Sequence, residues 1–85
     1  MKKSFAELKV DLEEACTFLR SFTLGRHGFT QRDGLAGIER VNMQCDRLNE
    51  LFASGPNAKE AATIAARGRS CVIAAEARLA YLRGK

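Results

Sequence analysis

Apolar residues recur every three or four positions along three stretches of the chain, which is the spacing that places them on one side of an α-helix. The first stretch follows Ser4 and Glu7, whose spacing is that of a capping box, and it stops at Gly25, a residue type that often ends helices. Its apolar positions are Phe5, Leu8, Leu12, Ala15, Leu19 and Phe22. The pattern predicts a first helix over about residues 5–24.

The second stretch has two candidate starting points. Thr30 can cap a helix with Asp33 at its third position, or Asp33 itself can be the cap just before Gly34. The apolar positions that follow are Ile38, Val41, Cys45, Leu48 and Phe52, supported by Leu35 and Leu51. Because Ser54-Gly55-Pro56 interrupts the chain, we predict a second helix over about residues 34–53.

The third stretch is the longest. Asn57 and Glu60 have capping-box spacing, and nothing after them interrupts a helix before Gly84, so the third helix is predicted over residues 58–83. Its apolar positions are mostly small: Ala61, Ala65, Gly68, Val72, Ala75, Leu79 and Leu82. A glycine inside a helix costs about 1 kcal/mol relative to alanine, so Gly68 predicts a closely approaching neighbour.

Three helices joined by connections this short predict an all-α fold, a three-helix up-down-up bundle with coiled-coil-like packing and a longer third helix. With 85 residues, we expect residues 1–85 to form a single helical domain. The third helix should extend about one or two turns beyond its partners. The predicted centre of the core consists of Leu8, Leu12, Leu19, Ile38, Val41, Leu48, Val72 and Leu79.

The third helix is also apolar on the side away from this predicted core. Ala62, Ala66, Ile73, Ala77, Ala80 and Tyr81 spread over much of that side. Alanine on a solvated face can simply reflect its helix propensity. Ile73 and Tyr81 add enough apolar area, however, for us to favour a second buried face. We therefore predict a protein partner there, with a homodimer expected and Ile73, Ala77 and Tyr81 in the contact.

The positive charge lies mainly in the last third of the chain, since residues 54–85 hold six basic and two acidic residues. A basic helix is typical of phosphate binding, so a DNA- or RNA-binding regulator is the alternative function. The helical wheel weakens it, because Arg67 and Arg78 lie on one flank while Arg69, Glu76 and Arg83 lie on the other. We expect Arg67 and Arg78 to face solvent or a protein partner.

The connection over residues 23–34 is long for a helical bundle and contains three glycines, with Arg26 and Phe29 between them. Long loops often carry binding residues, which makes Arg26 and Phe29 candidates for contact with a partner. The alternative is that Phe29 folds back over the end of the core as a lid. The sequence leaves both interpretations open.

The sequence contains no group of residues with the spacing typical of a catalytic or metal-binding site. His27 is the only histidine, and Cys16, Cys45 and Cys71 lie 29 and 26 residues apart without a C-x-x-C pair. Each cysteine falls on or beside an apolar stripe, so we expect three free thiols, with Cys45 the least reactive. We predict no enzyme, cofactor or metal.

The chain holds no apolar run long enough to span a membrane, and residues 1–3 lead into an acidic segment instead of an apolar signal core. The expected location is the cytoplasm, without membrane association. We predict a non-enzymatic adaptor, inhibitor or regulator that binds a macromolecular partner. Small size and the lack of cofactor sites also suggest a phage-encoded inhibitor of a host protein, although no residue pattern demonstrates that origin.

Overall fold

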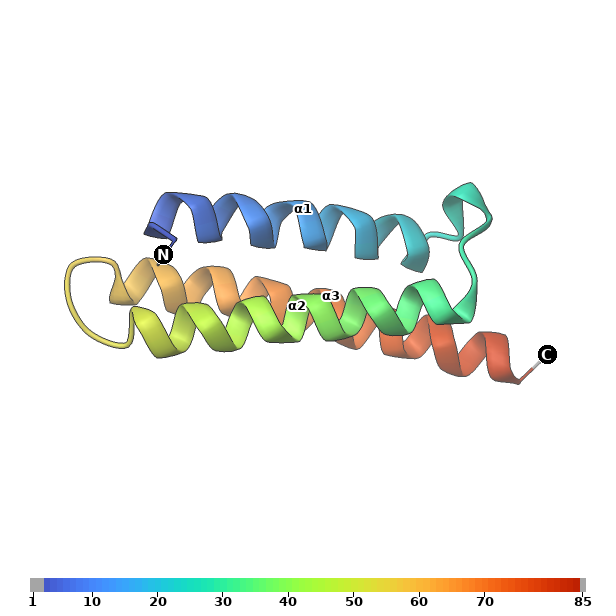
Figure 1. The fold of residues 1–85 in the computed structure, drawn as a ribbon. Coiled ribbons are helices and arrows are strands. Elements are labelled where there is room, and N and C mark those ends of the chain that lie inside the picture. Colours follow the sequence, from blue (N-terminus) through green and yellow to red (C-terminus); the bar gives the residue numbers. More distant parts are fainter. Residues whose placement is uncertain (1–2, 85) are drawn as a thin grey trace.

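The computed structural model describes residues 3–84 and contains four helical segments. They are α1 (Phe5–Thr23), a short 3₁₀ helix η1 (Arg26–Gly28), α2 (Gln31–Leu51) and α3 (Ala58–Arg83). The three long helices lie side by side and alternate in direction, with the α1–α2 and α2–α3 connections at opposite ends (Figure 1). The predicted all-α, up-down-up three-helix bundle is confirmed.

The first helix begins at the capping box that the sequence predicts. The Glu7 backbone N–H donates to Ser4 Oγ over 3.2 Å, and the Glu7 carboxylate accepts from the Ser4 backbone N–H. This exchange satisfies two donors that would otherwise lack partners at the helix start. At the other end Gly25 adopts φ 74°, a left-handed conformation that glycine tolerates without a Cβ clash.

The second helix starts three residues earlier than the range 34–53 predicted for it. Thr30 Oγ1 accepts from the Asp33 N–H over 3.2 Å, while Asp33 Oδ2 accepts from the Thr30 N–H over 2.8 Å. Thr30 is therefore the cap, and Asp33 lies inside the first turn. As a consequence Gly34 is a buried helical residue. The helix ends at Leu51, two residues before the predicted end.

The third helix covers residues 58–83 as predicted, but Asn57 caps it differently. The backbone of Asn57 has ψ 0°, and its side chain makes no capping hydrogen bond. A capping side chain needs an extended backbone to reach the first-turn N–H groups, so the predicted Asn57–Glu60 box is wrong. Glu60 instead accepts a hydrogen bond from Lys9 Nζ of α1 at 2.9 Å.

The core lies between all three helices and contains seven of the eight residues predicted for its centre. The eighth, Ile38, is partly buried and packs against it. Leu35 and Leu51, expected to support the buried stripe of α2, are instead 49% and 40% exposed. The core also contains Ile64, which the predicted stripe of α3 did not include, and α2 buries the polar Gln44 beside it.

Gly68 lies where α3 packs closely on α2. A Cβ at this position would lie 2.6 Å from Cys45 Sγ, closer than packed atoms tolerate, and 3.3 Å from Val41 Cγ1, a tight contact. The close contact that the sequence predicts for this glycine is confirmed. At the far end, the C-terminal turns of α3 project beyond the other two helices (Figure 1). The bundle is therefore elongated, with principal extents of 46 × 20 × 16 Å.

Candidate interaction surface on the outer side of α3

The side of α3 that faces away from α1 and α2 carries a nearly continuous strip of small and apolar residues. We call it the outer face of α3, and it consists of Ala62, Ala66, Ser70, Ile73, Ala77, Ala80 and Tyr81, all of them exposed. Ile73 is 66% exposed and Tyr81 54% exposed. The buried residues of α3, such as Val72, Ala75 and Leu79, belong to the opposite side. Three predicted contact residues, Ile73, Ala77 and Tyr81, thus share one surface.

Two hydroxyls on and beside this face have their hydrogen-bond partners within α3 itself. Ser70 Oγ donates to the Ala66 carbonyl over 3.2 Å, and Thr63 Oγ1 donates to the Lys59 carbonyl over 3.1 Å. A hydroxyl that already has a partner can be buried without the cost of losing a hydrogen bond to water. Both positions therefore behave as small, nearly neutral parts of the surface.

Arg78 lies at the C-terminal end of the face and links α3 to the end of α1. Its guanidinium carbon is 5.2 Å from the centre of the Tyr81 ring, a cation–π distance. A Cβ on Gly25 would lie 3.1 Å from Arg78 Nη2, so the guanidinium sits against the turn that follows α1. A cation is favourable near the C-terminus of a helix. Arg78, which we expected to face solvent or a protein partner, is partly buried.

One edge of the outer face, next to α2, is formed by Arg69, Glu76 and Arg83. Arg69 Nη2 lies 2.7 Å from Asp46 Oδ1, and Nη1 lies 3.1 Å from Asn42 Oδ1. These bonds hold the guanidinium of Arg69 between the two helices. Glu76 is exposed, and within the described residues no ion pair involves it. Sequence reasoning missed the Arg69 link because its partners belong to another helix.

The other edge borders a groove of about 470 Å³ between α1 and α3. Arg67 lines this groove together with Arg20 of α1, and the Lys9–Glu60 ion pair of 2.9 Å lies in it as well. Glu13 adds a second carboxylate to the lining. Positive and negative groups are mixed here, so the groove offers no uniformly basic track. Lys85, counted among the basic residues of the third helix, lies outside the described residues.

The connection between α1 and α2 brings Phe29 back toward the bundle. The Phe29 ring is partly buried and lies 4.8 Å from the Phe18 ring, centre to centre, at an angle of 45°. The His27 ring lies on Phe29 at 5.7 Å. Phe29 thus occupies the position of a lid at this end of the core, whereas Arg26 is exposed. Neither residue shares the outer face of α3.

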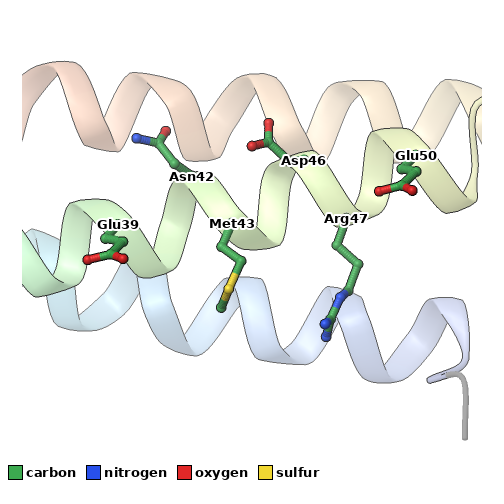
Figure 2. A pocket seen from close by; sticks show the side chains of 6 residues that line it. All are labelled: Glu39, Asn42, Met43, Asp46, Arg47 and Glu50. Carbon is green, nitrogen blue, oxygen red and sulfur yellow. The ribbon is translucent and has the colours of Figure 1, made fainter.

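A shallow depression of about 440 Å³ lies on the exposed side of α2 (Figure 2). Its side chains diverge: Asn42 and Asp46 point toward α3, while Met43 and Arg47 point to the opposite side. The carboxylates of Glu39 and Glu50 lie at opposite ends of it. Acid–base or metal chemistry needs polar groups that converge on one point, so this depression offers no reaction site.

The three cysteines come from three different helices and are all free thiols. Cys45 is completely buried, and its Sγ donates to the Ala65 carbonyl over 3.4 Å. Burial raises the pKa of Cys45, and burial together with the neighbouring Cys71 thiol raises the pKa of Cys16 to about 12. Cys71 is only partly buried. The thiols therefore differ in exposure, and burial raises the pKa of both buried thiols, Cys16 and Cys45.

We expect a thiol reagent at pH 8 to label native protein first at Cys71 and more slowly at Cys16 and Cys45, which are both buried. The thiolate is the reacting species, and at a fixed pH its population falls about tenfold for each unit by which burial raises the pKa. Peptide mapping after timed alkylation gives the order, and labelling in denaturant is the control in which the three rates converge. Native labelling of Cys45 before Cys71 would contradict the burial of Cys45.

Within residues 3–84, no cluster of three or more histidine, cysteine, aspartate or glutamate side chains could hold a metal ion. In the same range, no helix is both long and apolar enough to cross a membrane. Comparisons of the chain with protein-family models, with curated proteins and with solved structures found no match. The outer face of α3 is thus the main structural indication of function.

Proposed function

We propose that this protein is a non-enzymatic binding protein, an adaptor, inhibitor or regulator, which docks on a macromolecular partner through the outer face of α3. The observation that carries the proposal is the exposure of Ile73 and Tyr81, 66% and 54%, along a strip otherwise made of alanine and serine. The proposed site of action is the cytoplasm, and the proposed dimeric form is considered below.

Burial of this face would add apolar contact that the bundle alone cannot provide. Full burial of one large aliphatic side chain contributes about 1.5 to 3 kcal/mol, and aromatic residues such as tyrosine are frequent anchors of protein interfaces. The alanines keep the strip flat enough for another helix to approach closely. The geometry therefore fits a helical or flat protein surface better than a small molecule.

The positions of the arginines favour a protein partner over nucleic acid. Arg69 is engaged by Asp46, Arg78 lies against Gly25 and Tyr81, and Arg67 borders a groove that contains Glu13 and Glu60. Phosphate binding by several cations would weaken steeply as salt increases. Docking through alanine, isoleucine and tyrosine should change little over the same range.

The test is Ile73→Glu, with Met43→Glu as the matched control, because Met43 is 53% exposed on α2 and also apolar. Tagged wild type and both variants are used to capture partners from native lysate at about 50 and 500 mM salt. We expect Ile73→Glu to lose the captured protein at both salt concentrations and Met43→Glu to retain it.

Two results would count against the proposal. Capture that Ile73→Glu leaves intact would place the contact on another surface of the bundle. Captured nucleic acid that is released at high salt would favour the basic, nucleic-acid-binding alternative. The melting temperature of each variant is measured alongside, and it should remain near that of the wild type because both side chains are exposed.

A further inference from the structure

We propose that the occupant of the outer face of α3 is a second copy of the same chain, bound with its α3 antiparallel. This inference rests on the proposed function, because it names the partner for the same surface. It follows from the charges along one edge of the face, from the satisfied hydroxyls on it and from the length of α3.

The edge formed by Arg69 and Glu76 is complementary to itself when α3 is reversed. At about 100° per residue, Arg69 and Glu76 lie roughly 40° and 60° to the same side of Ile73. A two-fold axis perpendicular to two antiparallel helices places the same edge of each helix together. Arg69 of one protomer then faces Glu76 of its partner, and the symmetry makes this contact twice.

This pairing sets the register of the two helices. The two-fold axis passes midway between Arg69 and Glu76, which is between residues 72 and 73. Ile73 of both protomers then meets at the axis, and Ala66 lies almost level with Ala80 of the partner subunit. The most exposed aliphatic side chain of α3 is thus buried at the centre, with alanines on both sides of it.

A parallel arrangement lacks this complementarity. In a parallel dimer, the edge of α3 that carries Arg69 would lie against the edge of the partner's α3 that carries Arg67. The two arginines lie at nearly the same height along the helix, and the two-fold symmetry would create this repulsive contact twice. In the antiparallel arrangement Glu76, which no described ion pair involves, acquires a partner. Arg69 can bind it while held by Asp46, since guanidinium has five N–H donors and two of its nitrogens account for the bonds to α2.

The size of the contact predicts a weak dimer. The 26 residues of α3 extend about 39 Å, and a strip about 10 Å wide along them covers roughly 400 Å² on each protomer. Standard protein interfaces bury about 1,200 to 2,000 Å² in total. We therefore expect a dissociation constant on the order of tens of micromolar. Two buried hydroxyls do not weaken it further, because Ser70 and Thr63 donate to their own helix.

Analytical ultracentrifugation tests the register of the two helices. It compares the dimer affinity of Arg69→Glu alone, Glu76→Arg alone and their equimolar mixture. Each variant alone places like charges together twice, and we expect its dimer to weaken about tenfold or more. In the mixture both contacts join opposite charges, so a heterodimer should form with affinity within about threefold of the wild type. A mixture that associates no better than the separate variants would overturn the antiparallel register.

Arg69→Glu also removes the bond to Asp46, so Glu76→Arg and Glu76→Gln provide a second measurement that leaves this bond intact. We expect weakening of about tenfold for arginine and about threefold for glutamine. Unchanged affinity in both variants would overturn the contact. Wild type that remains monomeric at about 1 mM would overturn the second copy as the occupant. The proposed function is tested separately, by whether Ile73→Glu abolishes capture of a partner from lysate.

Discussion

Leu12→Ala is expected to lower the free energy of unfolding by about 2 to 5 kcal/mol and the melting temperature by roughly 10 °C or more. Leu12 is 1% exposed at the centre of α1 and belongs to the core shared by all three helices. Truncation removes apolar contact and leaves a cavity that the surrounding helices can fill only in part. A domain of this size has only roughly 0.05 to 0.15 kcal/mol per residue of total stability, so the effect is large.

Val10→Ala is the matched control, because Val10 lies on the same helix but is 50% exposed. Its substitution should change stability by no more than about 0.5 kcal/mol. Urea denaturation followed by circular dichroism measures both variants. Equal effects of the two substitutions, or an unchanged midpoint for Leu12→Ala, would show that the assigned buried side of α1 is wrong.

Gly34→Ala is expected to destabilise the protein by about 2 kcal/mol, although alanine is the better helix former by about 1 kcal/mol. A Cβ at Gly34 would collide with Phe22 Cζ and lie within 2.7 Å of two further ring carbons. Phe22 is 1% exposed, so its ring cannot move aside without disturbing the core. The steric clash should therefore outweigh the gain in helix propensity.

A double-mutant cycle with Phe22→Leu separates these two effects. Phe22→Leu alone should destabilise the protein, because a buried aromatic ring is lost. In that background the clash is relieved, and Gly34→Ala should become neutral or stabilising by up to about 1 kcal/mol. Thermal or urea denaturation of the four proteins gives the coupling energy. Stabilisation by Gly34→Ala in the wild type would mean that α1 and α2 are not in close contact here.

The periodic apolar positions were sufficient to predict the number of helices, their order and most of the core. Local chemistry was decisive at Ser4 and Glu7, whereas the same spacing at Asn57 and Glu60 predicted a capping box that does not form. At the start of α2, Thr30 and Asp33 both have capping side chains, so the sequence alone could not choose between them. In the structure Thr30 is the cap, and Gly34 packs against Phe22 within the first turn of the helix.

Other differences arise from contacts between helices. Ile64 is buried because α3 packs against both α1 and α2, which makes its buried side wider than a single stripe. Leu35 is exposed because it lies on the side of α2 away from the core, and Leu51 because it lies on the margin of the buried side. Arg78 is partly buried because it reaches the turn after α1, a contact that no spacing within α3 could reveal.

For the candidate site, the sequence predicted the outer face of α3 but not its surroundings. The wheel correctly separates Ile73, Ala77 and Tyr81 from the buried residues of the helix, because helical geometry alone fixes that separation. The bonds from Arg69 to Asn42 and Asp46 depend on how α2 lies beside α3. They hold one edge of the face in place, and within residues 3–84 no ion pair involves Glu76 on the same edge.

Concentration-dependent nuclear magnetic resonance tests self-association through the outer face of α3 most directly. Backbone amide spectra are recorded from about 20 µM to 1 mM protein, a range that spans the expected dissociation constant. We predict progressive shifts at residues 62, 66, 73, 77 and 80, with α1 and the exposed side of α2 around Met43 unchanged. Spectra that remain constant to 1 mM, or shifts centred on Met43, would contradict self-association through this face.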